Sequence, residues 1–273
     1  ELMDSFGLKL NMPTASAFIQ QRNKINPEAF KMLFYNFKNC IDEQKLFKGY
    51  RLLAVDGSDL RVPINPNETD SFHQRKNGDK PYNLLHINAL YDLERKIYTD
   101  VTVEGKKREN ESKAFVKMID RDTSIVPTIY IADRGYEAYN NMAHIQEKRQ
   151  KFVIRAKDFS YGGIVYSLNL PQNDELDEEV TLRLTRKQQT CNDQNLKFLP
   201  HKCVFDYLPS SCKKHISVTP YELKFRVVRF KLTEDTHEVL ITNLSKDDFS
   251  IEELKKLYAM RWGIENSFRD LKY

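Results

Sequence analysis

Two short apolar segments constrain the fold of this chain most, because each of them runs directly into an aspartate. Residues 52–55 precede Asp56, and residues 129–132 precede Asp133. Short apolar runs bounded by turn residues are typical of buried strands. Open α/β sheets bind their ligands outside the ends of such strands, so neighbouring strands would bring both carboxylates into one polar crevice.

The remaining elements predict a mixed α/β order. A turn at residues 57–58 is expected to end the first strand, and residues 61–82 read as a loop rich in proline and basic residues. The last segment is a helix capped by Ser250. The expected elements are helices over 14–48, 109–121, 137–150 and 251–273, and strands over 51–56, 83–91, 96–104, 129–132, 151–157, 225–232 and 237–244.

This order suits an α/β fold with an RNase H-like mixed-sheet core and flanking helices, interrupted by a β-rich insertion. Residues 49–157 and 226–273 form the expected core, and residues 158–225 the expected insertion. Residues 1–48 predict a helical segment of the DNA-binding type. We expect both ends to be trimmed, because Glu1 is not a start methionine and the chain stops within a predicted helix.

The composition is that of an ordinary globular protein with a mild basic excess. Hydrophobic residues make up 40% and charged residues 30% of the 273 residues, which allows a well-buried core. The net charge of +4 permits a nucleic-acid partner without proving one. No apolar run approaches the roughly 18 residues that span a bilayer, and no signal peptide opens the chain. A cytoplasmic protein without a membrane partner is therefore the expectation.

Asp56 and Asp133 predict a metal site if their strands are adjacent. Two neighbouring carboxylates repel each other unless a cation lies between them. Mg²⁺ prefers oxygen ligands and often binds one or two carboxylates together with a substrate phosphate. The alternative is that each aspartate only forms a turn or caps a helix, which is the commoner role of an isolated aspartate after a strand.

The closing helix is expected to place four functional side chains on one face. Tyr258, Arg261, Glu265 and Lys272 fall within an arc of about 60° in an ideal helix. The cationic groups could bind phosphates, and the carboxylate could complete a metal site. The alternative is a solvated face with an i,i+4 ion pair between Arg261 and Glu265. A neighbouring apolar stripe would dock the helix on the core; it consists of Leu257, Met260, Ile264, Phe268 and Leu271.

Three motifs resemble those of the insertion-sequence-four (IS-four-type) family of DDE transposases. The four side chains on that helix face match the family's YREK signature, with two, three and six residues between them. VDGSDL around Asp56 and IADRGYE around Asp133 look like the family's other two acidic motifs, in the same order. The resemblance covers about residues 14–273, nearly the whole chain.

The resemblance implies an enzyme that cuts DNA at transposon ends and joins it to a target. Asp56, Asp133 and Glu265 would be its catalytic, metal-binding residues, with two Mg²⁺ or Mn²⁺ ions. The implied partner is double-stranded DNA, both the terminal inverted repeats and the target. A homodimer assembled on this DNA is implied as well, in the bacterial cytoplasm at the nucleoid.

The resemblance also implies a set of DNA contacts. Tyr258, Arg261 and Lys272 would hold phosphates, and Arg134 would join them. Trp262 stands where relatives also have tryptophan, and an aromatic ring there could distort or stack an extruded base. Plain packing in the core is the alternative for Trp262.

Other function classes remain as alternatives. A catalytically inactive, transposase-derived DNA-binding protein is one, although the intact acidic trio argues against it. An RNase H-fold nucleotide-binding ATPase is another, but it predicts a second glycine-rich phosphate turn, for which Gly162-Gly163 is poor evidence. A zinc site in the insertion is disfavoured, because the spacing of its candidate ligands matches no common pattern; these are Cys191, His201, Cys203, Cys212 and His215.

Overall fold

The structure is a computed structural model that describes residues 14–22, 24–41, 45–74, 80–187, 195–209, 219–234 and 236–272. Contacts between residues divide the chain into two units, residues 1–43 and residues 44–273. Part of the expected basic loop, at residues 75–79, lies outside the described residues. The same holds for Cys191, Cys212 and His215, so the zinc alternative stays untested.

The described part of the first unit consists of two helices, α1 (Ala15–Arg22) and α2 (Pro27–Asn39). The side chain of Asn26 caps α2 by accepting a hydrogen bond of 3.0 Å from the backbone N–H of Glu28. Pro27 occupies the first turn, where its missing N–H costs no hydrogen bond. Helix α2 ends earlier than the predicted helical segment 14–48, because Cys40 already caps it.

The described part of the second unit contains ten strands, four α-helices and three short 3₁₀ helices. None of the described helices has both the length and the apolar content needed to cross a membrane. The elements are β1 (Arg51–Val62), β2 (Phe72–His73), β3 (Tyr82–Asp92), β4 (Ile97–Gly105), η2 (Lys106–Arg108), α3 (Glu111–Arg121), β5 (Thr128–Ala132), η3 (Arg134–Tyr136), α4 (Tyr139–Glu147), β6 (Lys151–Ala156), η4 (Val165–Ser167), β7 (Leu176–Thr185), β8 (Leu196–Phe198), β9 (Tyr221–Lys231), β10 (His237–Thr242), α5 (Ile251–Ala259) and α6 (Trp262–Lys272).

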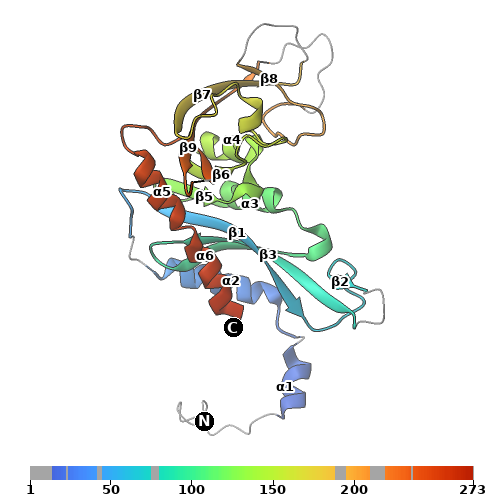
Figure 1. Cartoon of the computed structure of the whole chain (residues 1–273). Coiled ribbons are helices and arrows are strands. Elements are labelled where there is room, and N and C mark those ends of the chain that lie inside the picture. The colour runs from blue at the N-terminus through green and yellow to red at the C-terminus, as the bar shows by residue number, and fades with distance from the viewer. Residues whose placement is uncertain are drawn as a thin grey trace. The chain divides into compact units, whose positions relative to one another are not determined.

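All of these strands belong to one mixed sheet (Figure 1), in the order β2-β3-β1-β5-β6-β10-β9-β7-β8, with β4 paired to β3. Strands β1, β5 and β6 are parallel to one another. Strand β3 is antiparallel to β1, and β4 is antiparallel to β3. The predicted mixed α/β fold with flanking helices is confirmed, and this strand order is consistent with an RNase H-like core.

Strand β1 does not end at Asp56, so the predicted turn at residues 57–58 is wrong. Its parallel pairing with β5 stops at Val55, opposite Ala132. Its antiparallel pairing with β3 continues as far as Val62, and this keeps residues 57–58 extended. Asp56 therefore lies where β1 loses its neighbour β5, in the interior of a long strand.

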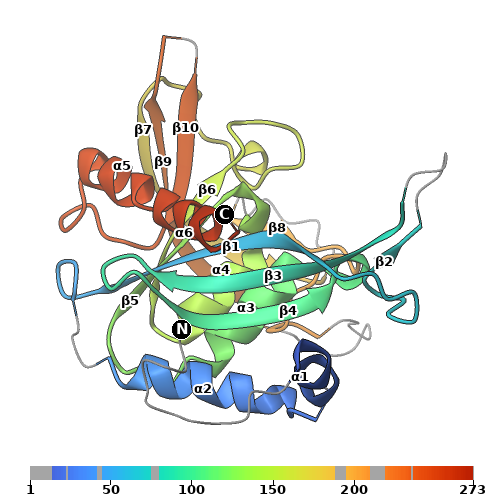
Figure 2. The same ribbon diagram turned by 90° about the horizontal axis from the view of Figure 1, so that it is seen from below.

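Helices cover both faces of the central strands. Figure 2 shows α3 and α4 on one side of β1 and α5 and α6 on the other. Successive side chains of a strand point to opposite faces. Leu53 and Val55 thus pack in the core on the side of α3 and α4, and Leu52 and Ala54 in the core on the side of α5 and α6. Burial on both faces explains why residues 52–55 of this strand are apolar at every position instead of alternating.

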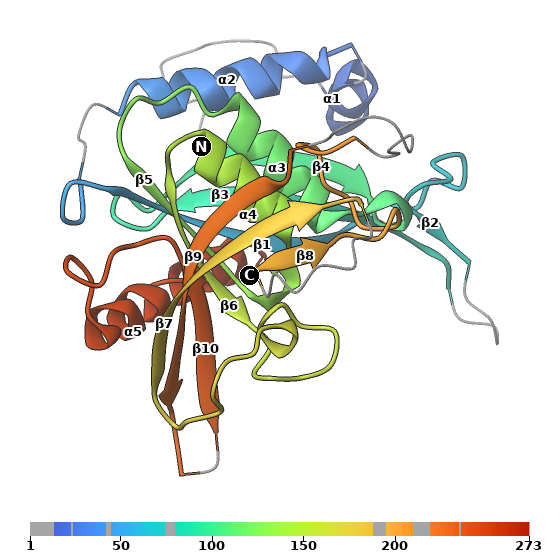
Figure 3. The ribbon, with the colours of Figure 1, turned by 90° about the horizontal axis from the view of Figure 1, so that it is seen from above.

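Strands from segment 158–225 extend the same sheet. Strand β7 pairs antiparallel with β9, and β8 pairs parallel with β7. Figure 3 shows β7 and β9 as long neighbouring strands, with β10 beyond β9. The β-rich texture of this segment therefore reflects strands that continue the sheet outward from β10.

The predicted closing helix is broken into α5 and α6, which corrects the expectation of one continuous helix. The backbone N–H of Met260 bonds to the carbonyl of Leu257, and that of Arg261 to the carbonyl of Tyr258, at 3.2 and 3.0 Å. Such i to i−3 bonds tighten the turn and interrupt the α-helical ladder. The helical-wheel geometry therefore does not run unchanged from α5 into α6.

The apolar stripe of the two closing helices docks only in part. Leu257, Ile264 and Phe268 are buried in the core, and Met260 is partly buried against it. Leu271 is 67% exposed, so this end of the stripe does not pack in the core. The stripe still anchors both helices to the face of the sheet that carries Leu52.

Candidate active site

The three predicted acidic residues come from three elements that pack together. Asp56 lies on β1, Asp133 directly follows β5, and Glu265 lies in the first turn of α6. Strands β1 and β5 are paired, and α6 packs on β1. All three side chains are partly buried. The fold therefore gathers residues that are far apart in the sequence.

Arg261 is a cation that these carboxylates share. Its side chain is buried, and its Nη2 donates a hydrogen bond of 2.6 Å to Oε1 of Glu265. The same guanidinium lies within electrostatic reach of Asp56 and Asp133. The i,i+4 ion pair that formed the alternative interpretation of this face is thus present. Its guanidinium is buried beside other carboxylates, however, while the Glu265 side chain is 33% exposed.

Burial and neighbouring charges shift the pKa values of Asp56 and Asp133 in opposite directions. Burial raises the pKa of Asp56 to about 6, and the carboxylates of Glu265 and Glu111 act in the same direction. Burial would also raise the pKa of Asp133, but the backbone N–H of Arg134 and a nearby guanidinium hold it below its usual value. A cation bound at Asp56 would relieve the repulsion that its neighbours impose on it.

Further side chains, from α5, β6 and β10, surround Asp133. The hydroxyl of Tyr258 donates a hydrogen bond of 3.2 Å to Oδ1 of Asp133. Nη1 of Arg155 lies 3.8 Å from the same oxygen, and its Nε lies 3.1 Å from Oε1 of Glu238. Sequence reasoning missed Arg155 and Glu238. The available signal was a charged residue beside the apolar run of each of these two strands.

The residues predicted to contact DNA fall into an exposed group and a buried group. Arg134 and Lys272 are exposed, and Trp262 is 59% exposed. Packing of Trp262 in the core, the alternative for this residue, is therefore wrong. Tyr258 and Arg261 are buried, at 6% and 4% exposure. Only the first three can meet a large ligand without rearrangement.

Two of the exposed side chains contact residues in or next to the acidic site. Nζ of Lys272 donates a hydrogen bond of 2.7 Å to Oγ of Ser58, which follows Asp56 by two residues on β1. The guanidinium of Arg261 lies over the indole ring of Trp262, 5.6 Å from its centroid. The side chains predicted to share one helix face therefore still contact one site, despite the break between α5 and α6.

The donor set suits a divalent cation with oxygen ligands. Asp56, Asp133 and Glu265 offer carboxylates, which Mg²⁺ and Mn²⁺ prefer. The nearby hydroxyl of Tyr136 is buried without a hydrogen-bond partner in the described residues, and such groups normally bond to water or a ligand. Within the described residues, the three carboxylates do not form a group with all ligand atoms inside 4.8 Å. A two-ion site does not require this, since its ions lie about 3.5–4 Å apart.

A tighter group of possible ligands, Asp59, His86 and Glu109, lies beside this site. A lysine already occupies it: Nζ of Lys106 is 3.0 Å from Oδ1 of Asp59 and pairs with Glu109. The carboxylates of Glu111 and Asp59 raise the pKa of His86 to about 9. Because the Lys106 ammonium already lies among these side chains, we interpret this group as an ion-pair network.

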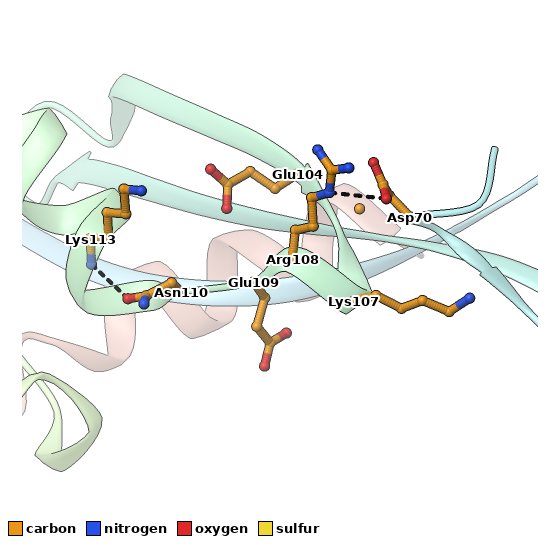
Figure 4. A pocket seen from close by; sticks show the side chains of 8 residues that line it. Asp70, Glu104, Lys107, Arg108, Glu109, Asn110 and Lys113 are labelled. Carbon is orange, nitrogen blue, oxygen red and sulfur yellow. Dashed lines mark hydrogen bonds and ion pairs between the residues drawn. The ribbon is translucent and has the colours of Figure 1, made fainter. Parts of the chain in front are cut away.

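A cavity of about 500 Å³ adjoins η2. Figure 4 shows Arg108 paired with Asp70, and the side chain of Asn110 accepting a hydrogen bond from the backbone of Lys113. Three cationic and three acidic side chains line the cavity, so its charges balance and it does not by itself indicate a phosphate site. These side chains are Lys107, Arg108, Lys113, Asp70, Glu104 and Glu109.

Comparison with known proteins gives one family and one related fold. A family model described as a transposase DDE domain matches residues 47–273. No curated protein matches the chain. Among solved structures, the chain is similar to a chain in the cryo-EM structure of the piggyBac transposase synaptic complex with hairpin DNA, with a TM-score of 0.50 and 11% identity. The similarity covers 96% of this chain and 48% of that one, so this chain spans about half the length of that relative. At this identity the likeness is one of fold.

Proposed function

This chain belongs to the transposase DDE domain family, and from that premise we propose that it cleaves transposon-end DNA and transfers the cut strand in a metal-dependent reaction. Asp56, Asp133 and Glu265 are the proposed catalytic, metal-binding residues. The observation that carries the proposal is the gathering of these three carboxylates around the guanidinium of Arg261. Acidic groups that converge in this way need cations to offset their repulsion.

The protein's own residues would prepare the site for metal and substrate. The three carboxylates would hold two Mg²⁺ or Mn²⁺ ions. Such ions, when bound, activate the attacking hydroxyl and stabilise the leaving oxygen. Tyr258 would orient Asp133 through its hydrogen bond, and Arg261 would orient Glu265. Both are buried, so we assign them to positioning the carboxylates.

Within the family, we propose that the chain is an IS-four-type transposase with the YREK signature. Support comes from the signature side chains, because Tyr258, Arg261 and Lys272 each bond to an acidic residue of the site or to β1. The signature therefore corresponds to a set of contacts around one site. A chance match on an unrelated solvated helix would not produce these contacts.

The proposed partner is double-stranded DNA, as transposon ends and as target, bound by a homodimer assembled on it. Trp262, Arg134 and Lys272 are the proposed direct contacts because they are exposed next to the acidic site. Tyr258 and Arg261 would touch DNA only after leaving their carboxylate partners. The piggyBac relative was solved in a synaptic complex with hairpin DNA, which supports DNA as the ligand by analogy of fold.

The decisive experiment is cleavage of duplex DNA that ends in the inverted repeats flanking the gene, with Mn²⁺. Glu265→Gln should abolish cleavage and leave DNA binding largely intact, because it removes a metal ligand but no phosphate contact. Asp270→Asn is the matched control, since it removes an exposed carboxylate from the same helix. Wild-type cleavage by Glu265→Gln would reject the assignment. A wild-type protein that binds the repeats but never cuts them would favour the inactive DNA-binding alternative.

A further inference from the structure

Helix α3 directs a fourth carboxylate, that of Glu111, toward the two proposed catalytic aspartates. Glu111 is the first residue of α3. Its Oε1 would lie 2.6 Å from a Cβ atom at Gly57, and its Oε2 would lie 3.3 Å from a Cβ atom at Gly135. These glycines follow Asp56 by one residue and Asp133 by two. The carboxylate therefore lies between the chain segments that carry both aspartates.

The glycine at position 57 is needed for this approach. A side chain there would collide with Oε1 of Glu111 and with Nε2 of His86, each within 2.7 Å of the added Cβ. The backbone of β1 can come this close to the carboxylate only without a Cβ atom. Strand β1 and helix α3 are thus shaped so that Glu111 reaches the acidic site.

Capping of α3 does not require the Glu111 carboxylate. Asn110 already caps α3, because its side chain accepts a hydrogen bond of 2.9 Å from the backbone N–H of Lys113. Nε2 of His86 lies 3.4 Å from Oε1 of Glu111, but Nδ1 of the same ring pairs with Asp59 at 2.7 Å. The histidine therefore has a closer counter-ion in Asp59, and its other ring nitrogen faces the Glu111 carboxylate.

A buried hydroxyl independently indicates a missing ligand at this place. Tyr136 is 1% exposed, and its hydroxyl has no hydrogen-bond partner within the described part of the chain. It lies within electrostatic reach of Glu111, Asp56 and Asp133. A buried hydroxyl without a partner forfeits a hydrogen bond, so a water molecule on a bound ion is a suitable acceptor or donor for it.

We propose that Glu111 is a fourth metal-binding carboxylate of this site and that His86 orients it. The ligand class is a hard divalent cation, Mg²⁺ or Mn²⁺, which takes carboxylate oxygens. A side chain that pairs with a metal ligand can fix the ligand's orientation, and loss of such support weakens metal affinity. The inference rests on the proposed metal-dependent function, and it adds a ligand that the acidic trio does not include.

The test is a titration of the metal-free 273-residue chain with Mn²⁺ alone, without DNA, in which electron paramagnetic resonance measures the free ion. Glu111→Gln should weaken Mn²⁺ affinity about 10–100-fold, the range found when groups around a metal are removed. The matched control is Glu104→Gln. It removes a carboxylate of β4 that lies 3.5 Å from Nζ of Lys117, a residue of α3. This control should bind Mn²⁺ as the wild type does. Asp56→Asn serves as the reference for a ligand of the proposed trio.

The outcomes separate the two proposals. If Asp56→Asn weakens binding but Glu111→Gln matches the wild type, the role of Glu111 is overturned and the proposed function stands. If neither variant changes affinity, the proposed metal site itself fails. Should Glu111→Gln not fold, as judged by thermal melting without metal, Glu111→Asp replaces it. That variant keeps the charge beside His86 but withdraws the oxygens by one methylene, so wild-type affinity in it would also overturn the inference.

Discussion

The hydroxyl of Tyr258 donates a hydrogen bond of 3.2 Å to Oδ1 of Asp133, although 125 residues separate the two in the chain. Tyr258 is buried, and burial raises its pKa far above the ordinary value. The phenol therefore stays protonated and remains a donor at neutral pH. This contact joins α5 to the end of β5 and holds one of the proposed metal ligands in a defined position.

Tyr258→Phe should slow single-turnover cleavage about 10-fold or more, because a hydrogen bond to a charged group contributes about 1.5–3 kcal/mol. The rate is measured with Mn²⁺ and DNA both saturating, so that binding does not limit it. Tyr98→Phe is the control, since it removes a hydroxyl that accepts a hydrogen bond of 2.8 Å from Ser267 of α6 and not one that bonds to a proposed catalytic carboxylate. Equal rates in the two variants would contradict a specific role for Tyr258.

Arg261→Leu should lower the free energy of unfolding by about 3–5 kcal/mol in the absence of divalent ions, the usual effect of removing one partner of a buried ion pair. Asp56, Asp133 and Glu265 lose their shared cation in this variant. Added Mn²⁺ should restore part of the loss, because the ion takes over the neutralising charge. Urea unfolding with and without Mn²⁺ measures both effects.

A second buried ion pair provides the control for Arg261. Nε of Arg95 lies 2.8 Å from Oδ2 of Asp92, whose side chain is fully buried. Arg95→Leu should therefore destabilise the protein as well, without any rescue by Mn²⁺. If Mn²⁺ stabilised both variants equally, or neither, the shared-cation interpretation of Arg261 would be refuted.

Trp262→Ala should weaken binding to transposon-end DNA without lowering the melting temperature, because this side chain is exposed. Stacking of one base on an aromatic ring contributes about 1–3 kcal/mol, so a loss of about 10-fold in affinity is expected. Leu271→Ala, which truncates another exposed apolar side chain of α6, should leave the affinity unchanged. Unaltered affinity in Trp262→Ala would exclude the stacking role.

Lys272→Ala should instead change the salt dependence of DNA binding. Loss of one phosphate contact lowers the slope of log K against log salt by about one. Trp262→Ala should leave that slope unchanged, since stacking releases no counterions. Affinities measured across a series of salt concentrations distinguish the two roles, and an unchanged slope for Lys272→Ala would place this ammonium away from the phosphates.

Asp177→Ala should lower the free energy of unfolding at neutral pH by about 3–5 kcal/mol, because it leaves a buried guanidinium unpaired. Arg226 is 2% exposed and pairs with Asp177. Burial would raise the pKa of Asp177, but the guanidinium of Arg226 outweighs it and the pKa is lowered. The stabilisation is therefore fully present above the unfolded-state pKa of about 3.9 and is lost as the pH falls through the lower folded-state value.

Unfolding in urea at pH 7 and at acidic pH measures this dependence. The wild type should lose more stability on acidification than Asp177→Ala, which has already lost the ion pair. Asp174→Ala is the control, since that exposed carboxylate lies 3.0 Å from Nε2 of His237, and surface pairs contribute about 0–1 kcal/mol. Equal acid sensitivity in the wild type and Asp177→Ala would show that another group dominates.

Local sequence patterns predicted most elements of the sheet core, and the failures at β1 and at the closing helix have physical causes. The apolar run before Asp56 identifies a buried strand, but β1 extends to Val62 because β3 continues to pair with it. The closing segment has helical periodicity throughout, yet the backbone bonds at Met260 and Arg261 break it. Strand length and helix continuity depend on which backbone partners are available and on how closely segments approach one another. Gly263, for example, packs so close to Leu93 that an added Cβ would lie 2.9 Å from it. The periodicity of a sequence does not encode such contacts.

The sequence alone determined the identity, order and spacing of the acidic residues proposed for catalysis, because apolar runs and signature spacing are local properties. Tertiary structure decided which charges meet. The burial of Arg261, the pairing of Arg155 with Glu238 and the approach of Glu111 to Gly57 all join segments distant in the chain. Electrostatic environment depends on distance in space and on exclusion of water, and both arise only when the sheet and its helices pack.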